Sequence, residues 1–360
     1  MKNVQARMYH IIGLMSGSSL DGLDMAHCIF SINGDTIGYE ITHAECLDYP
    51  VDWRNRLRNA HLLSGSNLLL LHSAYGQYLG DAVNAFIKQN NITRVDAIAS
   101  HGHTVFHDPK NKMTFQLGHG AFLAKQTNLQ VVADFRQEDI AAGGQGAPIV
   151  PIADKYLFAD YDVCINLGGI ANVTIKKNDY MLAYDVCVCN QLLNHFANAA
   201  GKPYDSNGAM AAKGRIATAL LDSWNAHSYF GRNAPKSLSN FFVAQMIAES
   251  IKQDCAVNDL LRTACEHVAV QINAVLEHYS VPAAAKILLS GGGACNAFLV
   301  KCVMEKCTAE IVVPEEQIIH YKEALAMAFM GLKRLRNEVN ILKQYTGAQS
   351  DSIAGVIYNP

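Results

Sequence analysis

The stretch "LMSGSSLDGLDMA", Leu14 to Ala26, places a tip of glycine, serine and aspartate between two apolar flanks. The flanks "YHIIGLM" and "GLDMAHCIF" are typical of β-strands, so we predict a β-hairpin with a wide tip. A turn of this composition exposes backbone N–H groups on one concave side, which favours an anion and phosphate above all. The carboxylates of Asp21 and Asp24 repel phosphate, so their presence indicates a divalent cation such as Mg²⁺ between them and the phosphate.

Two further glycine turns follow apolar strands later in the chain. In "VCINLGGIANVTIKK" a strand over 163–167 meets Gly168 and Gly169 before a strand over 171–176, and "AKILLS" runs into "GGGACN". One glycine turn is equally consistent with a polar tip that binds no ligand. Three such turns favour a nucleotide site, in which two turns hold the phosphates and the third lies against a flat adenine ring.

The length and the alternation of strands with helical patterns indicate the architecture. A chain of 360 residues exceeds the usual size of one hydrophobic core, so we expect two domains. Helical periodicity over 68–89, 260–279 and 322–335, between predicted strands, indicates an α/β fold with mixed sheets. We place the boundary in the glycine-rich segment 139–148. The first lobe is then 1–138 plus 345–360, and the second is 139–344.

The charge distribution narrows the class of ligand. The formal net charge is −3 with both signs mixed along the chain, which gives no footprint for nucleic acid or an anionic membrane. We therefore expect a small-molecule partner and no membrane or nucleic-acid partner. We find no export signal and no apolar run near the ~20 residues of a spanning helix. The ten cysteines are then expected to be reduced thiols in the cytoplasm.

Several ordered blocks together resemble the anhydro-N-acetylmuramic acid kinase family, within the superfamily of sugar kinases, actin and heat-shock chaperones. The resemblance implies a two-lobed actin-like/sugar-kinase (ribonuclease H-like) α/β fold with mixed sheets and a central nucleotide cleft. The blocks that carry it are "GLMSGSSLDGLD" (13–24), "SHGHTVFHDP" (100–109), "ADFRQEDIAAGGQGAPIVP" (133–151), "NLGGIANVT" (166–174), "GKPYDSNG" (201–208), "LSGGGACN" (289–296), "EALAMAF" (323–329) and "GVIYNP" (355–360).

The same resemblance implies an activity and a set of site residues. Members use ATP and Mg²⁺ to open the 1,6-anhydro bridge of the sugar with water and to phosphorylate O6, in peptidoglycan recycling. Asp185 would be the catalytic base, Thr104 and Arg136 would contact the sugar, and Asp21 would hold the metal. A homodimer is left open. The nucleotide residues would be Gly17, Ser18, Ser19, Leu20, Asp21, Gly22, Leu23, Asp24, Gly168, Gly169, Gly291, Gly292 and Gly293.

The segment after Asp185 departs from the family pattern. The family has D-T-G-P-G-N, whereas this chain reads "DVCVCN" to Asn190. If those glycines let the backbone approach a ligand, the β-carbons of Cys187 and Cys189 would crowd the sugar site. Two alternatives follow: a kinase of another anhydro-sugar such as levoglucosan, or a nucleotide-binding homologue without turnover. His103 also stands where the family has Gln, although both side chains donate and accept hydrogen bonds.

Four features have a structural reading beside a functional one. His101, His103 and His107 have a spacing that suits zinc, but the family block explains them without metal. Cys187 and Cys189 fit a buried apolar pair better than a redox pair. Asp205 is either a turn former or a residue near the nucleotide. Glu323 either complements the N-terminal dipole of a helix that it opens or faces the cleft.

Overall fold

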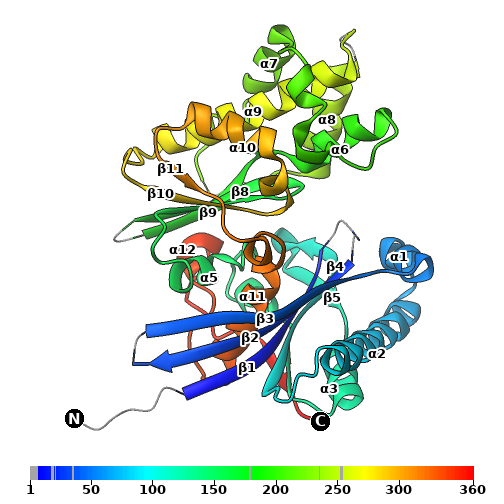
Figure 1. Cartoon of the computed structure of the whole chain (residues 1–360). Helices are drawn as coiled ribbons and strands as arrows, with labels where there is room; N and C mark the ends of the chain where they lie inside the picture. Colours follow the sequence, from blue (N-terminus) through cyan, green and yellow to red (C-terminus); the bar gives the residue numbers. More distant parts are fainter. Residues whose placement is uncertain are drawn as a thin grey trace. The chain divides into compact units, whose positions relative to one another are not determined.

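The computed structural model describes residues 7–17, 20, 22–34, 36–177, 180–234, 236–251 and 254–360 (Figure 1). The chain divides into two compact units. Unit 1 consists of Met1–Leu157 and Tyr321–Pro360, and unit 2 of Phe158–His320. The chain therefore passes twice between the units, and each unit is described by itself.

Unit 1 is built on a seven-stranded mixed sheet. The order is β12-β6-β4-β1-β2-β3, with β5 paired to β4. The pairs β1–β4 and β4–β6 are parallel, and β1–β2 and β2–β3 are antiparallel. The strands are β1 (Arg7–Ser16), β2 (Gly22–Asn33), β3 (Thr36–Asp48), β4 (Ala97–Asp108), β5 (Met113–Leu117), β6 (Val131–Ala133) and β12 (Val356–Tyr358).

Helices cover the sheet of unit 1. The buried residues of α2 and α3 share one core with Ile12, Leu14 and Ile98 of the sheet. The long helix α11 packs elsewhere on the same sheet, with the rings of Phe30 and Phe329 5.9 Å apart. The helices of the unit are α1 (Val51–Arg58), α2 (Gly65–Gln89), α3 (Gly120–Thr127), α4 (Gln137–Ala141), α5 (Pro151–Tyr156), α12 (Lys343–Thr346) and, entering from unit 2, α11 (Glu316–Leu335).

Unit 2 has a five-stranded sheet in the order β11-β10-β7-β8-β9, which leaves β9 at an edge. Helices cover one face of the sheet (Figure 1). Residues of α6, α7, α8, α9 and α10 share with that face a single buried core that contains Trp224. The elements are β7 (Val163–Leu167), β8 (Ile170–Lys177), β9 (Tyr180–Val188), α6 (Asn190–Ala199), α7 (Thr218–Asn225), α8 (Asn240–Ile251), α9 (Val257–His278), β10 (Lys286–Ser290), α10 (Ala297–Lys306) and β11 (Glu310–Val312).

The predicted α/β class with mixed sheets is confirmed, but the units differ from the lobes that we drew. Residues 139–157 and 321–344, expected in the second lobe, lie in unit 1. The part of 321–344 that belongs to α11 lies in unit 1 because this helix packs on the sheet of that unit. Gly13 approaches the backbone of Ala324 so closely that a Cβ on Gly13 would meet the Ala324 oxygen at 1.9 Å. Glu323 lies inside α11 and does not open it, because the helix begins at Glu316. The dipole reading of Glu323 was wrong.

Among the helices in the described part of the chain, none combines the length and the apolar character that crossing a membrane requires.

The contact between Gly13 and α11 predicts a position-specific stability effect. In Gly13→Ala the new methyl group would overlap the backbone of Ala324, and overpacking of this kind costs about 1–3 kcal/mol. In the control Gly65→Ala the added Cβ has no atom within 4 Å, and alanine is the better helix former by about 1 kcal/mol. Thermal unfolding should show a lower Tm for Gly13→Ala and an equal or higher Tm for Gly65→Ala. Equal Tm values would contradict the packing.

Candidate active site

In unit 2 the turn between β7 and β8 is held by the start of α6. The backbone N–H groups of Cys189 and Asn190 donate to the carbonyls of Gly169 and Gly168 at 3.0 and 3.1 Å. The side-chain amide of Asn190 donates to the carbonyl of Leu167 at 2.9 Å. The turn predicted to bind phosphate is therefore fixed by residues that follow the strand of Asp185.

The second glycine loop packs against the same turn. Gly291 has φ 80°, and a Cβ there would meet Asn166 Oδ1 at 2.2 Å, so only glycine fits. A Cβ on Gly293 would meet the Cβ of Leu167 at 2.7 Å. Gly292 is different, because its added Cβ would meet only the amide of Asn190, at 3.8 Å. Two predicted nucleotide turns thus lie together, with Gly292 open to a ligand.

Asp185 lies near the end of β9, paired with Asn172 of β8 next to a register shift. Its carboxylate Oδ2 accepts a hydrogen bond from the backbone N–H of Leu238 at 2.9 Å. Burial raises the pKa of Asp185 above its ordinary value, while the N–H of Leu238 pulls the pKa back down. The side chain is only partly buried. Such a carboxylate can take a proton from water.

The side chains of Cys187 and Cys189 lie in a hydrophobic core, as the reading of a buried apolar pair predicts. Both side chains are fully buried in the core of unit 2. Strand β9 continues to Val188, and a register shift between Asp185 and Cys187, where Val186 pairs with no residue of β8, lets the Cys187 side chain lie in the core. Cys189 follows the strand as the N-cap residue of α6. Burial raises the pKa of Cys187 far above its ordinary value and that of Cys189 to about 12. Both are neutral thiols at neutral pH, as a buried apolar pair requires.

The first hairpin, in unit 1, is described only in part, since Ser18, Ser19 and Asp21 lie outside the described residues. The backbone N–H of Leu20 donates to the carbonyl of Gly17 at 3.3 Å. Leu20 has φ 60°, and its side chain lies in the core with that of Leu23. Neither leucine side chain can contact a ligand, so only their backbone groups remain for that role.

The base of this hairpin carries a buried hydrogen-bond chain. The hydroxyl of Tyr49 donates to Ser16 Oγ at 2.7 Å, and Ser16 Oγ also pairs with His103 Nδ1 at 3.2 Å. Tyr49 pairs further with Tyr75 at 2.6 Å. Thr104, next to His103, accepts a bond from Gln116 Nε2 at 3.4 Å. These contacts fix the block that was expected to touch the sugar.

Arg136 is oriented by a histidine of that same block. Its Nε and Nη2 lie 3.0 and 2.8 Å from His101 Nε2, and its Nη1 donates to the carbonyl of Gly146. His101 Nδ1 lies 2.9 Å from the carbonyl of Gly102, so Nδ1 carries the proton and Nε2 accepts. Burial, helped by the charge of Arg136, lowers the pKa of His101 to about 3. A neutral histidine therefore fixes this cation.

Glu323 lies close enough to Asp24 and Arg136 for their charges to act on its carboxyl group. Burial raises the pKa of Glu323, the charge of Asp24 raises it further, and Arg136 and Lys322 lower it. Two carboxylates near one another suit a divalent cation. Glu323 lies inside α11 rather than at its terminus, and its place in the site stays a prediction.

The remaining candidates have structural partners. His107 Nδ1 pairs with Thr114 at 3.1 Å. Within the described ranges no three side chains of His, Cys, Asp or Glu gather as metal ligands would. Both carboxylate oxygens of Asp205 accept backbone N–H groups, from Met210 and Ala211, at 2.9 Å. These contacts hold the backbone after Asp205, as expected of a residue that stabilises a turn.

The family model of anhydro-N-acetylmuramic acid kinase matches residues 9–360. Curated relatives of that name come from Sulfurovum sp. (strain NBC37-1), 34% identical over 371 residues with 96% of this chain and 98% of the relative covered, and from Vibrio vulnificus (strain CMCP6), 32% identical with 97% and 98% covered. One from Bacillus cereus (strain ATCC 10987 / NRS 248) is 30% identical, with 98% and 99% covered.

A match of this extent defines a class, the sugar kinases, as the sequence predicted. The chain belongs to the anhydro-N-acetylmuramic acid kinase family. The two-lobed sugar-kinase fold and the family resemblance expected from the sequence are both confirmed. Membership of a kinase family also implies the use of ATP.

Sequence reasoning missed the contacts that Tyr229 and Leu238 make with Asp185. The segment that carries them, "YFGRNAPKSLSN" (229–240), reads as a turn between two helical patterns. No local signal connects it with a residue about fifty positions earlier. The placement of Glu323 was open in the sequence, because helix boundaries are the least reliable part of such a prediction.

Thiol labelling of the native protein should distinguish the cysteines. Cys46 and Cys295 are exposed, whereas Cys187 and Cys189 are buried with strongly raised pKa values. We expect a maleimide to modify Cys46 and Cys295 under native conditions, and Cys187 and Cys189 only after unfolding, as measured by peptide mass spectrometry. Native labelling of the "DVCVCN" segment would show that these thiols face solvent.

Proposed function

We propose that this protein opens 1,6-anhydro-N-acetylmuramic acid with water and phosphorylates its O6 from ATP, giving N-acetylmuramic acid 6-phosphate for peptidoglycan recycling. The observation that carries the proposal is the family match over residues 9–360, joined to a partly buried carboxylate at Asp185. We also propose a cytoplasmic location. A homodimer, and the lack of a nucleic-acid partner, stay predictions.

Asp185 is the base of the proposed reaction. It accepts a proton from water as the water oxygen bonds to C1 of the sugar and the bond from C1 to O6 breaks. O6 leaves C1 as the nucleophile that bonds to the γ-phosphorus, while the bond from that phosphorus to the β,γ-bridging oxygen breaks and ADP leaves, so no second protein acid is required. In this respect Asp185 resembles the base of an inverting glycosidase. A partly buried carboxylate with a raised pKa suits the role, because it is a stronger base than a solvated aspartate.

The nucleotide is assigned to the glycine turns. Gly168 and Gly169 would hold phosphate through backbone N–H groups, together with Gly17 and the rest of the first hairpin. The loop of Gly291, Gly292 and Gly293 would lie along adenosine, and the open side of Gly292 fits this assignment. Phosphoryl transfer depends on alignment and on charge neutralisation rather than on covalent help from the protein.

Mg²⁺ is assigned to the carboxylates of unit 1. Asp24 and Glu323 act on one another electrostatically, and this pair of oxygen donors fits a hard divalent cation that keeps several waters. Asp21 stays a predicted ligand. When bound, the cation would neutralise phosphate charge during the transfer.

Arg136 and Thr104 are assigned to the sugar. The guanidinium of Arg136 is held by His101 and Gly146, and a planar fork of donors suits a carboxylate. The lactyl group of the muramic acid carries a carboxylate that a non-muramyl anhydro-sugar lacks. This argues for the muramyl substrate over levoglucosan.

A panel of anhydro-sugars tests the substrate. We expect ADP release and a sugar 6-phosphate, detected by mass spectrometry, with 1,6-anhydro-N-acetylmuramic acid and far less with levoglucosan. Removal of Mg²⁺ by EDTA should abolish turnover. Equal or faster turnover of levoglucosan would favour the kinase of another anhydro-sugar, and ATP binding without turnover of any sugar would favour the non-catalytic homologue.

Asp185→Asn tests the base and makes a second prediction about stability. Loss of general-base help should lower kcat by at least about 10²-fold, while calorimetry should show ATP binding close to the wild type. The folded state raises the pKa of Asp185. The ionised carboxyl therefore lowers the stability of the fold at pH values above the pKa that this group has in the unfolded chain. The variant should therefore be as stable or more stable at pH 7, and the difference should vanish below pH 3.8, the ordinary value. Retained activity would refute the role.

A further inference from the structure

We propose that the connection between α7 and α8 is a clamp that positions Asp185, with Tyr229 as its principal positioning residue. The described part of this connection is residues 226–234 and 236–239, and we call it the α7–α8 clamp. The inference rests on the proposed function, because it concerns the carboxylate assigned there as the base.

The clamp contacts Asp185 at three atoms. The hydroxyl of Tyr229 donates to the backbone carbonyl of Asp185 at 2.5 Å. The backbone N–H of Asp185 donates to the carbonyl of Lys236 at 3.4 Å, and the N–H of Leu238 donates to Oδ2 at 2.9 Å. Because β9 is an edge strand, no further strand among the described residues pairs with this side of Asp185. The clamp supplies that support for both backbone and side chain.

The clamp leaves one oxygen of the carboxylate available. Oδ2 is engaged by Leu238, and Oδ1 has no hydrogen-bond partner among the described residues. A carboxylate fixed through one oxygen presents the other in a single direction. This is the condition for accepting a proton from one water molecule at a defined place.

The side chain of Lys236 joins the second part of the clamp to the first. Its Nζ donates to the carbonyls of Tyr229 and Phe230 at 3.3 and 3.4 Å. The same ammonium group lies over the rings of Tyr184 and Tyr229, 5.2 and 4.7 Å from their centres. Tyr184 belongs to β9, so the cation joins the clamp to the strand that carries Asp185.

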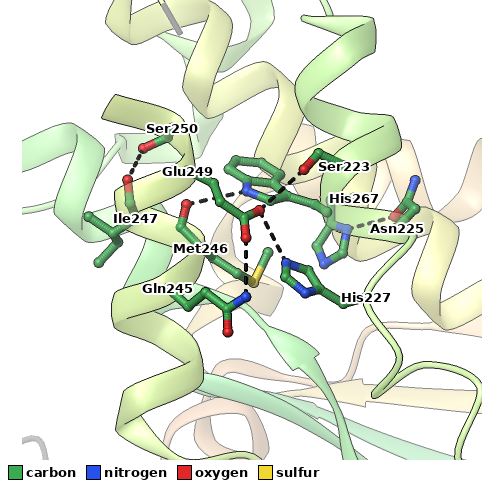
Figure 2. A network of polar contacts seen from close by, with 10 residues as sticks. Ser223, Asn225, His227, Gln245, Met246, Ile247, Glu249, Ser250 and His267 are labelled. Atoms are coloured by element: carbon green, nitrogen blue, oxygen red, sulfur yellow. Dashed lines mark hydrogen bonds and ion pairs between the residues drawn. The ribbon is translucent and has the colours of Figure 1, made fainter. Parts of the chain in front are cut away.

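A polar network anchors the start of the clamp and joins the two helices on either side of it (Figure 2). At its start, His227 Nε2 pairs with Glu249 of α8 at 3.1 Å. The same carboxylate accepts hydrogen bonds from Ser223 of α7 and Gln245 of α8 at 3.4 and 3.3 Å. Figure 2 shows these side chains converging on Glu249. The two helices that the clamp connects are thereby tied to one another.

A hydrogen bond from Trp224 and the ring of Phe242 also hold the start of the clamp against α7 and α8. The indole N–H of Trp224 in α7 donates to the carbonyl of Met246 in α8 at 3.3 Å. The ring of Phe242 in α8 packs against those of His227 and Tyr229, with centres 5.1 and 5.6 Å apart. Tyr229 is buried, so its hydroxyl is shielded from solvent and stays hydrogen-bonded to the carbonyl of Asp185.

Tyr229→Phe removes the hydroxyl and keeps the ring. We expect kcat to fall about 10-fold, since small displacements of a catalytic group have large effects on rate, with unchanged KM for ATP and the sugar and an unchanged Tm. The control Tyr279→Phe removes a hydroxyl that pairs with Tyr184 and should keep the wild-type kcat. The proposal is overturned if Tyr229→Phe keeps the wild-type kcat, or if kcat falls only together with Tm.

Leu238→Pro provides a second readout that does not depend on Tyr229. It removes the N–H that lowers the pKa of Asp185, so the acidic limb of the kcat/KM profile should move to higher pH. The nearby groups Cys187 and Tyr229 are neutral there because burial raises their pKa. Leu238→Ala keeps the N–H and should leave the limb in place. An unmoved limb in Leu238→Pro would contradict the clamp.

A double-mutant cycle separates the clamp from the base. If Tyr229 acts through Asp185, adding Tyr229→Phe to Asp185→Asn should lower the residual rate no further. If Tyr229→Phe lowers the rate by the same factor in both backgrounds, the clamp is refuted and the assignment of Asp185 as the base is not affected. Full activity of Asp185→Asn would instead overturn the proposed function, and the clamp with it.

Discussion

The hydrogen bond from the N–H of Leu238 to Oδ2 of Asp185 balances two opposed demands on one carboxylate. Burial makes the group a stronger base by raising its pKa, and the same burial would protonate it if carried too far. A single N–H bond to the charged form offsets part of that effect. The carboxylate is therefore held in place while part of the rise in its pKa is offset. The role proposed for Asp185 as the base depends on this balance.

Unit 1 handles a buried cation in a comparable way. Arg136 loses hydration, and burial lowers its pKa to about 10, but it gains His101 and the carbonyl of Gly146 as acceptors. His101 accepts only because it is neutral and its other nitrogen is engaged by Gly102. The block "SHGHTVFHDP" thus combines the histidine that orients the cation with the threonine predicted to touch the sugar. Its three histidines have separate partners, because His101 pairs with Arg136, His103 with Ser16 and His107 with Thr114.

Local composition predicted the features that depend on short-range geometry. The hairpin of Leu14 to Ala26 and the loop of Gly291 to Gly293 were evident because glycine has few substitutes where the backbone turns or comes close to another chain segment. The units were harder, since α11 follows unit 2 in sequence yet packs on the sheet of unit 1 through Gly13. The inward direction of Cys187 was hard to predict, because it depends on how β9 continues beyond Asp185. The contact with Tyr229 joins residues 44 positions apart, and no local pattern encodes it.

The most direct test of this account is a titration of the Asp185 side-chain carboxyl by ¹³C NMR, with the signal assigned by its loss in Asp185→Asn. We expect a pKa above that of an ordinary aspartate and an ionised group at neutral pH. We also expect a further rise when Leu238→Pro removes the N–H donor. An ordinary or lowered pKa would show a solvated carboxylate that nothing holds, and a group still protonated at pH 7 could not serve as the base.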